Sequence, residues 1–213
     1  MLKLLLRMLR SKVVSNALWI VICKGLQAVL GVIISVISAR ILGPVNYGLV
    51  NYAASLVLFV TPVAQLGMAA TLVHEVVSCP DADHEGRVMG TAIISSLVSS
   101  VLCILGILLF VSVSNPNEPE TLVVCGLYSL LLLSQGAELI QYWFQAKLLS
   151  KYTAIITLIA YVLISAYQIV ILAAGRGVNW FAIAKAAEYA MIAVALLIIF
   201  HRKSQCKLLW LIW

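Results

Sequence analysis

The stretch SARILGPVNYG, residues 38–48, decides how this chain is organised, because it joins two long apolar runs. Arginine, glycine, proline, asparagine and tyrosine gather within it, so polar backbone and charge lie where they can leave hydrocarbon for water. We interpret the stretch as a turn at a membrane face. The apolar runs on either side of it then predict membrane-spanning helices.

The composition supports the same class of protein. Apolar residues make up 63% of the chain and charged residues only 10%, against roughly 25% charged in an ordinary soluble domain. The net charge of +6 comes from basic residues in short groups between apolar runs, without a basic and aromatic patch, which argues against nucleic acid as a partner. The five cysteines fall singly, so neither a disulfide framework nor a metal site is expected.

The remaining apolar runs predict an all-α, polytopic membrane protein, a bundle of six transmembrane helices within residues 13–200. The expected spans lie near residues 17–37, 47–72, 88–112, 121–144, 152–174 and 180–200. Proline at position 62 predicts a kink in the second span. Residues 1–12 read as an amphipathic cytoplasmic helix and residues 201–213 as a basic cytoplasmic tail.

The distribution of lysine and arginine predicts the orientation of this bundle. With six spans, one side of the membrane collects most of the cations, and the positive-inside rule makes that side cytoplasmic. Both termini are therefore expected in the cytoplasm. The external side receives Arg40 and Arg176, and the cytoplasmic side receives Lys3, Arg7, Arg10, Lys12, Arg87, Lys147, Lys151, Arg202, Lys203 and Lys207.

Residues 74–87 are predicted to form the longest hydrophilic loop. This stretch contains two histidines and four acidic residues, which together could suggest a metal site. They follow no helical ligand spacing, however, so a solvated loop is the preferred interpretation.

No enzyme motif is present in the sequence. It contains no nucleophile elbow, no glycine-rich phosphate loop and no histidine–cysteine cluster at ligand spacing. We therefore expect a protein that is not an enzyme and needs no cofactor or metal. The informative residues are instead the ionisable ones inside predicted spans, since a charge at mid-bilayer costs ~2.5–3.5 kcal/mol and usually faces a cavity or a partner.

Four such residues suggest an interior polar site, although their roles stay open. Lys24 lies near the middle of its span and is expected to line a cavity. Lys185 and Glu188 stand three residues apart and could simply neutralise each other. Glu138 is either a proton-coupling carboxylate or the partner of Lys24, and Glu188 is a second coupling candidate. The candidate substrate-binding residues are Lys24, Gln27, Arg40, Glu138, Gln141 and Lys185. Cations with amides and aromatics suit a diphosphate that carries sugars, and composition alone does not separate that cargo from an amphipathic anion or a drug.

Several short motifs resemble those of the polysaccharide exporters, the oligosaccharide or O-antigen flippases of the multidrug/oligosaccharidyl-lipid/polysaccharide superfamily. The family pattern A-R-x-L-G-P-x-x-Y-G is matched within residues 39–48. Weaker matches open the first span, end the second span and end the fourth span. The matching residues are Ala39, Arg40, Leu42, Gly43, Pro44, Tyr47 and Gly48, then Ser15, Asn16 and Trp19, then Gln65, Leu66, Gly67 and Met68 with His74 and Glu75, and finally Trp143, Phe144, Gln145 and Ala146.

This resemblance implies a transporter of the bacterial inner membrane. Such a protein would flip undecaprenyl-pyrophosphate-linked oligosaccharide units for O-antigen (lipopolysaccharide), capsule or exopolysaccharide, by alternating access of two helical lobes. Family members carry roughly twice as many spans, so the chain is expected to be an N-terminal lobe and a fragment. The implied partners are the lipid-linked oligosaccharide, membrane lipids, a second six-helix lobe, and polymerase or glycosyltransferases.

Two rival functions remain. One is a drug or organic-cation antiporter of the same superfamily, and the other is a non-transporting scaffold of a polysaccharide synthase complex. In a scaffold, Lys24 and Glu138 would hold helices together, so replacing either by glutamine should lower abundance without stopping export. A transporter predicts normal abundance and lost export.

Overall fold

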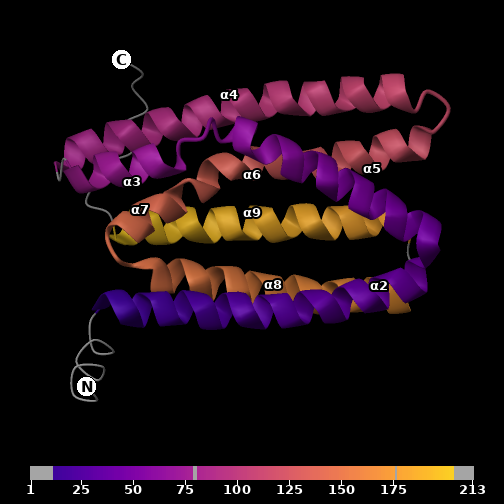
Figure 1. Cartoon of the computed structure of the whole chain (residues 1–213), viewed down its shortest axis with the longest axis horizontal. Helices are drawn as coiled ribbons and strands as arrows, with labels where there is room; N and C mark the ends of the chain where they lie inside the picture. The colour runs from indigo at the N-terminus through magenta and orange to yellow at the C-terminus, as the bar shows by residue number, and fades with distance from the viewer. Residues whose placement is uncertain (1–11, 79–80, 176, 204–213) are drawn as a thin grey trace, which may run out of the picture.

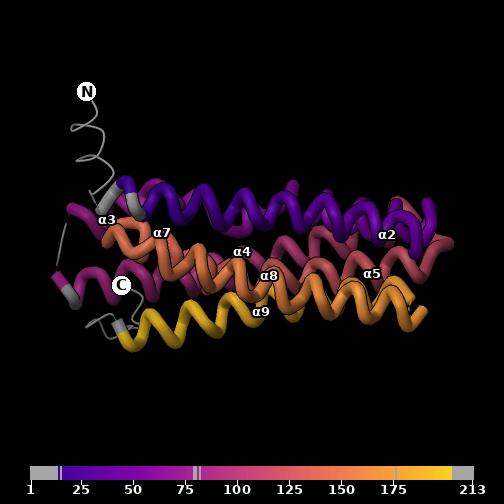
Figure 2. Tube along the Cα trace, turned by 90° about the horizontal axis from the view of Figure 1, so that it is seen from below, coloured from indigo at the N-terminus to yellow at the C-terminus, as the bar shows by residue number. Residues whose placement is uncertain are grey.

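The computed structural model describes residues 12–78, 81–175 and 177–203, and over these residues it contains helices and turns but no strand. Figure 1 shows long helices lying side by side along one direction, and Figure 2 shows α2 and α9 on opposite sides of the bundle with other helices between them. The helices are α2 (Lys12–Ala64), α3 (Ala69–Ser78), α4 (Ala82–Ser114), α5 (Pro119–Ser129), α6 (Leu131–Glu138), α7 (Ile140–Ala146), α8 (Ser150–Ala173) and α9 (Val178–Lys203).

The number of separate spans differs from the prediction because of α2. It runs the length of the bundle, bends at Gly43 and returns (Figure 1). Among the described residues, five helical segments are long and apolar enough to cross a membrane, not six, because the first two predicted spans join into one of them. Gly43 alone leaves helical geometry, at φ 75° and ψ 170°, a region open almost only to glycine. The predicted turn is therefore a single-residue bend.

The segment after α2 also differs from the prediction. The helix ends at Ala64, two residues after Pro62, and a turn with positive φ at Leu66 and Gly67 leads into α3. The predicted loop at residues 74–87 was wrong, because most of it is helical: α3 continues to Ser78 and α4 begins at Ala82. Leu72 and Val76, one turn apart on α3, are both buried, and their packing stabilises this short helix.

The fourth predicted span is a broken helix. Residues 121–144 fall within α5, α6 and α7, which meet at Leu130 and Leu139. The other spans agree with the sequence to within a few residues, except that α4 starts earlier than expected.

Two large apolar clusters and one small one, which contains Ile164, Ile171 and Ala184, hold the described part of the bundle together. One large cluster lies among α2, α4, α5, α6 and α9 and includes Val111, Val124 and Leu132. The other large cluster lies toward the end of the bundle that holds α3 and α7, where the Trp143 ring meets Phe144 and Phe200 edge-on, with centroids 5.1 and 5.0 Å apart. Many large apolar side chains stay exposed on the outside, as expected of a surface that faces lipid. The chain is a polytopic helical membrane protein.

The first residues of α2 and the last residues of α9 lie at the same end of the bundle, beside α3 and α7 (Figure 1). The Gly43 bend and the turn between α4 and α5 lie at the opposite end. The predicted amphipathic segment at residues 1–12 and the tail at residues 201–213 lie almost wholly outside the described residues.

Candidate functional site

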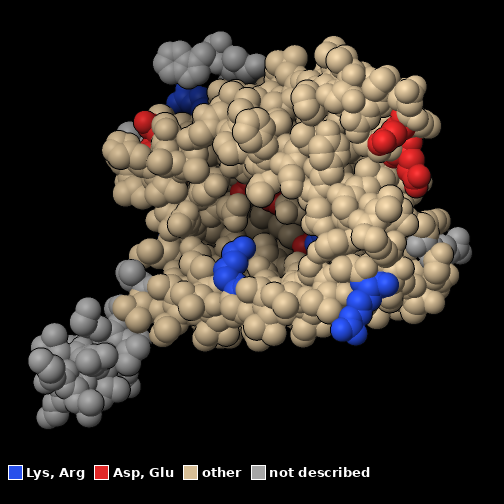
Figure 3. All heavy atoms as spheres, turned by 45° about the vertical axis from the view of Figure 1, so that its right-hand side comes forward, with Lys and Arg blue, Asp and Glu red and all other residues tan. Residues whose placement is uncertain are grey.

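A hollow opens in one face of the bundle. Figure 3 shows it with basic atoms on its rim and acidic atoms within it. Ionisable side chains that face one another inside a membrane bundle are expected to contact water, a partner or a substrate. The four ionisable residues predicted to lie within spans, Lys24, Glu138, Lys185 and Glu188, come from α2, α6 and α9.

Lys24 is exposed on α2 and lines a cavity of about 210 Å³. Gln141 of α7 lines the same cavity, as do the hydroxyl-bearing Thr153 and Thr157 of α8. No carboxylate of the described chain lies within ion-pair distance of Lys24. This lysine is therefore a cation open to an external anion.

Glu138 is the last residue of α6 and is half-buried. Its carboxylate interacts electrostatically with Lys24 and with Glu188 of α9. The sequence left open whether Glu138 pairs with Lys24, and the structure holds them close enough to interact but not in an ion pair. The break at Leu139 places this carboxylate at a helix end.

Lys185 and Glu188 form the ion pair that their spacing allowed, with Nζ and Oε2 2.8 Å apart. Glu188 is buried, and Lys185 also lies over the Tyr161 ring at 5.2 Å from its centroid. Lys185 lines a second cavity of about 270 Å³ together with Gln135 and Tyr189. Its charge is thus largely balanced, which leaves Lys24 as the cation better placed for an anionic ligand.

Tyrosines surround the carboxylates, and sequence reasoning did not group them. Tyr128, Tyr142, Tyr161 and Tyr189 each interact electrostatically with Glu138, Glu188 or both. They come from four helices, and the breaks at residues 130 and 139 shift the helical phase between α5 and α7. No spacing within the sequence could therefore have gathered them.

The structure does not bring every predicted site residue to the hollow. Gln27 donates to Thr157 Oγ1 at 3.3 Å and so links α2 to α8. Arg40 is exposed and stands three residues before Gly43, at the far end of the bundle. Lys24 and Gln141 share a cavity, and Glu138 connects Lys24 electrostatically to Glu188.

Glu85 was missed because its segment was predicted to be a solvated loop. It is 3% exposed, in the first turn of α4. Its carboxylate accepts a hydrogen bond from Trp143 Nε1 at 3.0 Å and an ion-paired hydrogen bond from Lys147 Nζ. This contact fastens the start of α4 to α7. Trp143, one of the residues that resemble the exporter family at the end of the fourth span, was a signal, since a buried indole needs an acceptor.

Within the described ranges, no three histidine, cysteine, aspartate or glutamate side chains are arranged to hold a metal ion. Cys23, Cys103 and Cys125 are free thiols.

The fold and the hollow define a helical membrane protein with a charged interior site. A family model described as polysaccharide biosynthesis protein matches residues 13–207, so the chain belongs to that family. This membership supports a role in polysaccharide biosynthesis or export. Neither the curated proteins nor the solved structures contain a match to the chain.

Proposed function

We propose that this chain is one lobe of a flippase that moves undecaprenyl-pyrophosphate-linked oligosaccharides across the bacterial inner membrane. The observation that carries the proposal is the charged cluster of Lys24, Glu138, Lys185 and Glu188 inside a membrane bundle. Membership of the polysaccharide biosynthesis protein family supports a polysaccharide as part of the cargo. The cargo would serve a surface polymer such as O-antigen, capsule or exopolysaccharide.

Each part of the cluster suits one part of such a cargo. Lys24 has no ion-pair partner among the described residues and faces a cavity, so its ammonium can donate to pyrophosphate oxygens. Gln141 and the nearby threonines offer donors and acceptors for sugar hydroxyls. Glu138 and Glu188 are the carboxylates that a proton or cation gradient could act upon.

The size of the cavities fits a single lobe. At about 210 and 270 Å³ they are smaller than the ~300–1,000 Å³ of most small-ligand pockets, although the cargo is large. A second helical lobe facing the hollow would complete the chamber, in the manner of transporters built from repeats. We place both ends of the chain in the cytoplasm, which also suits partnership with glycosyltransferases or a polymerase.

The proposal is tested by Lys24→Gln in cells that make this protein. Losing one charge-assisted hydrogen bond of ~1.5–3 kcal/mol should lower surface polysaccharide by about tenfold or more, with the lipid-linked precursor accumulating and protein abundance unchanged. Arg202→Gln is the matched control, because Arg202 is an exposed cation at the end of α9.

Other outcomes would favour the rival functions. Unchanged export with reduced abundance would favour the scaffold of a synthase complex. Unchanged export with lost resistance to cationic drugs would favour the antiporter. Either result overturns the flippase proposal.

A further inference from the structure

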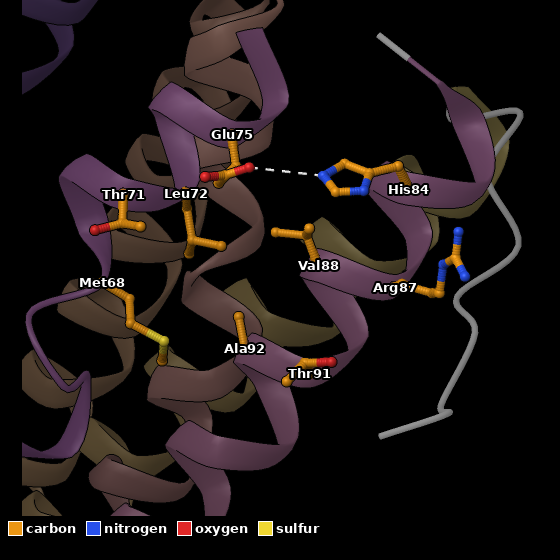
Figure 4. Close-up of a pocket in the computed structure, with 9 residues that line it drawn as sticks. All are labelled: Met68, Thr71, Leu72, Glu75, His84, Arg87, Val88, Thr91 and Ala92. Carbon is orange, nitrogen blue, oxygen red and sulfur yellow. Dashed lines mark ion pairs between the residues drawn. The ribbon is translucent and has the colours of Figure 1, made fainter. Parts of the chain in front are cut away.

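A second site lies between α3 and α4, away from the charged hollow. It is a cavity of about 460 Å³ lined by Met68, Thr71, Leu72, Glu75, His84, Arg87, Val88, Thr91 and Ala92. Figure 4 shows these side chains on the two helices, with His84 pointing toward Glu75 and Arg87 extending away from it. None of them belongs to the candidate substrate-binding set.

The lining of this cavity changes from charged to mostly apolar along the helices. Its ionisable residues, Glu75, His84 and Arg87, lie toward the end of the bundle, where α3 ends and α4 begins. At 1.5 Å per residue, Met68, which directly precedes α3, lies about 10 Å deeper than Glu75, and Ala92 lies about 12 Å deeper than His84 and about 7.5 Å deeper than Arg87. The cavity therefore has a charged mouth at the level expected for lipid headgroups and a mostly apolar interior, with Thr71 and Thr91 in its wall, at the level expected for acyl chains.

The charges at the mouth are of both signs. Glu75 Oε2 lies 3.6 Å from His84 Nε2, and both side chains are more than a third exposed. His84 Nε2 is nevertheless buried and has no hydrogen-bond partner in the part of the chain that the structure describes. Arg87 is exposed and offers a guanidinium fork suited to phosphate. The mouth thus offers one acceptor for an ammonium group and donors for a phosphate.

We propose that this cavity binds a zwitterionic phospholipid with a primary amine, of the phosphatidylethanolamine type. The ammonium group donates to Glu75, the phosphate accepts from Arg87, and an acyl chain lies against Leu72 and Val88. A trimethylated amine has no N–H to donate to Glu75, and an anionic headgroup without an amine meets the Glu75 carboxylate unfavourably. The inference depends on the membrane location alone and not on the flippase proposal.

The experiment measures lipid retention by the purified full chain in detergent, by native mass spectrometry. Three probes with identical acyl chains are compared: phosphatidylethanolamine, phosphatidylcholine and phosphatidylglycerol. We expect phosphatidylethanolamine to bind about tenfold more tightly than the other two, the size of one hydrogen bond to a charged group.

Two variants assign the preference to this cavity. Glu75→Gln should reduce the preference for phosphatidylethanolamine over phosphatidylcholine to within about twofold. Arg87→Gln should weaken the binding of both lipids by a similar factor of about tenfold. Glu120→Gln and Arg202→Gln remove an exposed carboxylate and an exposed cation elsewhere and should change nothing. Equal retention of all three lipids, or an unchanged preference in Glu75→Gln, overturns the inference, provided that each variant remains monodisperse.

Discussion

At the residue scale, the Glu85 carboxylate links the start of α4 to the end of α7. It is buried, and it contacts Trp143 and Lys147, which come from the end of another helix. Removing the acceptor leaves a buried indole N–H unsatisfied, and a buried unsatisfied group costs about 1–3 kcal/mol. Lys147 contributes less, because it is partly exposed and regains water.

We therefore expect Glu85→Ala to lower the free energy of unfolding by about 1–3 kcal/mol, and Glu85→Gln to lower it by less, because the amide oxygen still accepts from Trp143. The measurement is unfolding in mixed detergent micelles, followed by helicity. Glu120→Ala removes an exposed carboxylate and serves as the control. Equal stability of Glu85→Ala and wild type would contradict the role assigned to the contact.

The same residue shows where prediction from sequence stopped. Lys24, Glu138, Lys185 and Glu188 could be singled out because charges in apolar runs are conspicuous. Glu85 stands in a polar stretch, where acidic residues usually meet water, and only the approach of α7 in space buries it. Tertiary contacts between residues far apart in sequence left no local pattern to read.

At the scale of helices, Gly43 determines how α2 reverses. A Cβ atom there would meet nothing within 4 Å, so any penalty for alanine comes from the backbone at φ 75° and not from a clash. Gly48 lies on the same helix with equally open surroundings but without a positive φ. The two glycines form a matched pair that separates conformational strain from packing.

Gly43→Ala should destabilise the protein by about 1–3 kcal/mol, the usual cost of a non-glycine residue in this region. Gly48→Ala should be neutral or stabilising by up to about 1 kcal/mol, since alanine is the better helix former. Denaturation of both variants in the same detergent checks the prediction. A larger loss in Gly48→Ala than in Gly43→Ala would reject the bend as the sensitive position.

Sequence predicted the helices whose ranges depend on the length of an apolar run alone. It did not predict where helices bend, break or end. The ranges of α8 and α9 follow from their apolar runs, which have no competing signal. The bend at Gly43 and the breaks at Leu130 and Leu139 depend on one or two residues each. Such local departures from helix geometry leave the hydrophobic pattern almost unchanged.

At the scale of the whole molecule, the two ends of the described chain share one end of the bundle, and Arg40 lies at the other. The positive-inside rule predicts that the first of these ends is cytoplasmic. In a cysteine-free background, Arg40→Cys should react with a membrane-impermeant maleimide added outside intact inner-membrane spheroplasts. Lys151→Cys, at the start of α8, should react only after the membrane is opened. The reverse pattern would show the opposite orientation.

The contact of Glu85 with Lys147 also affects how the chain inserts during synthesis. The two residues are separated by 62 positions, so the ribosome makes the lysine about 3–12 s after the glutamate at ordinary rates of ~5–20 residues per second. During that interval the carboxylate in the first turn of the nascent α4 lacks both Trp143 and Lys147, and hydrocarbon disfavours such a charge while the aqueous boundary accommodates it. The acid thus keeps the beginning of the new helix at the membrane surface until α7 arrives to bury it.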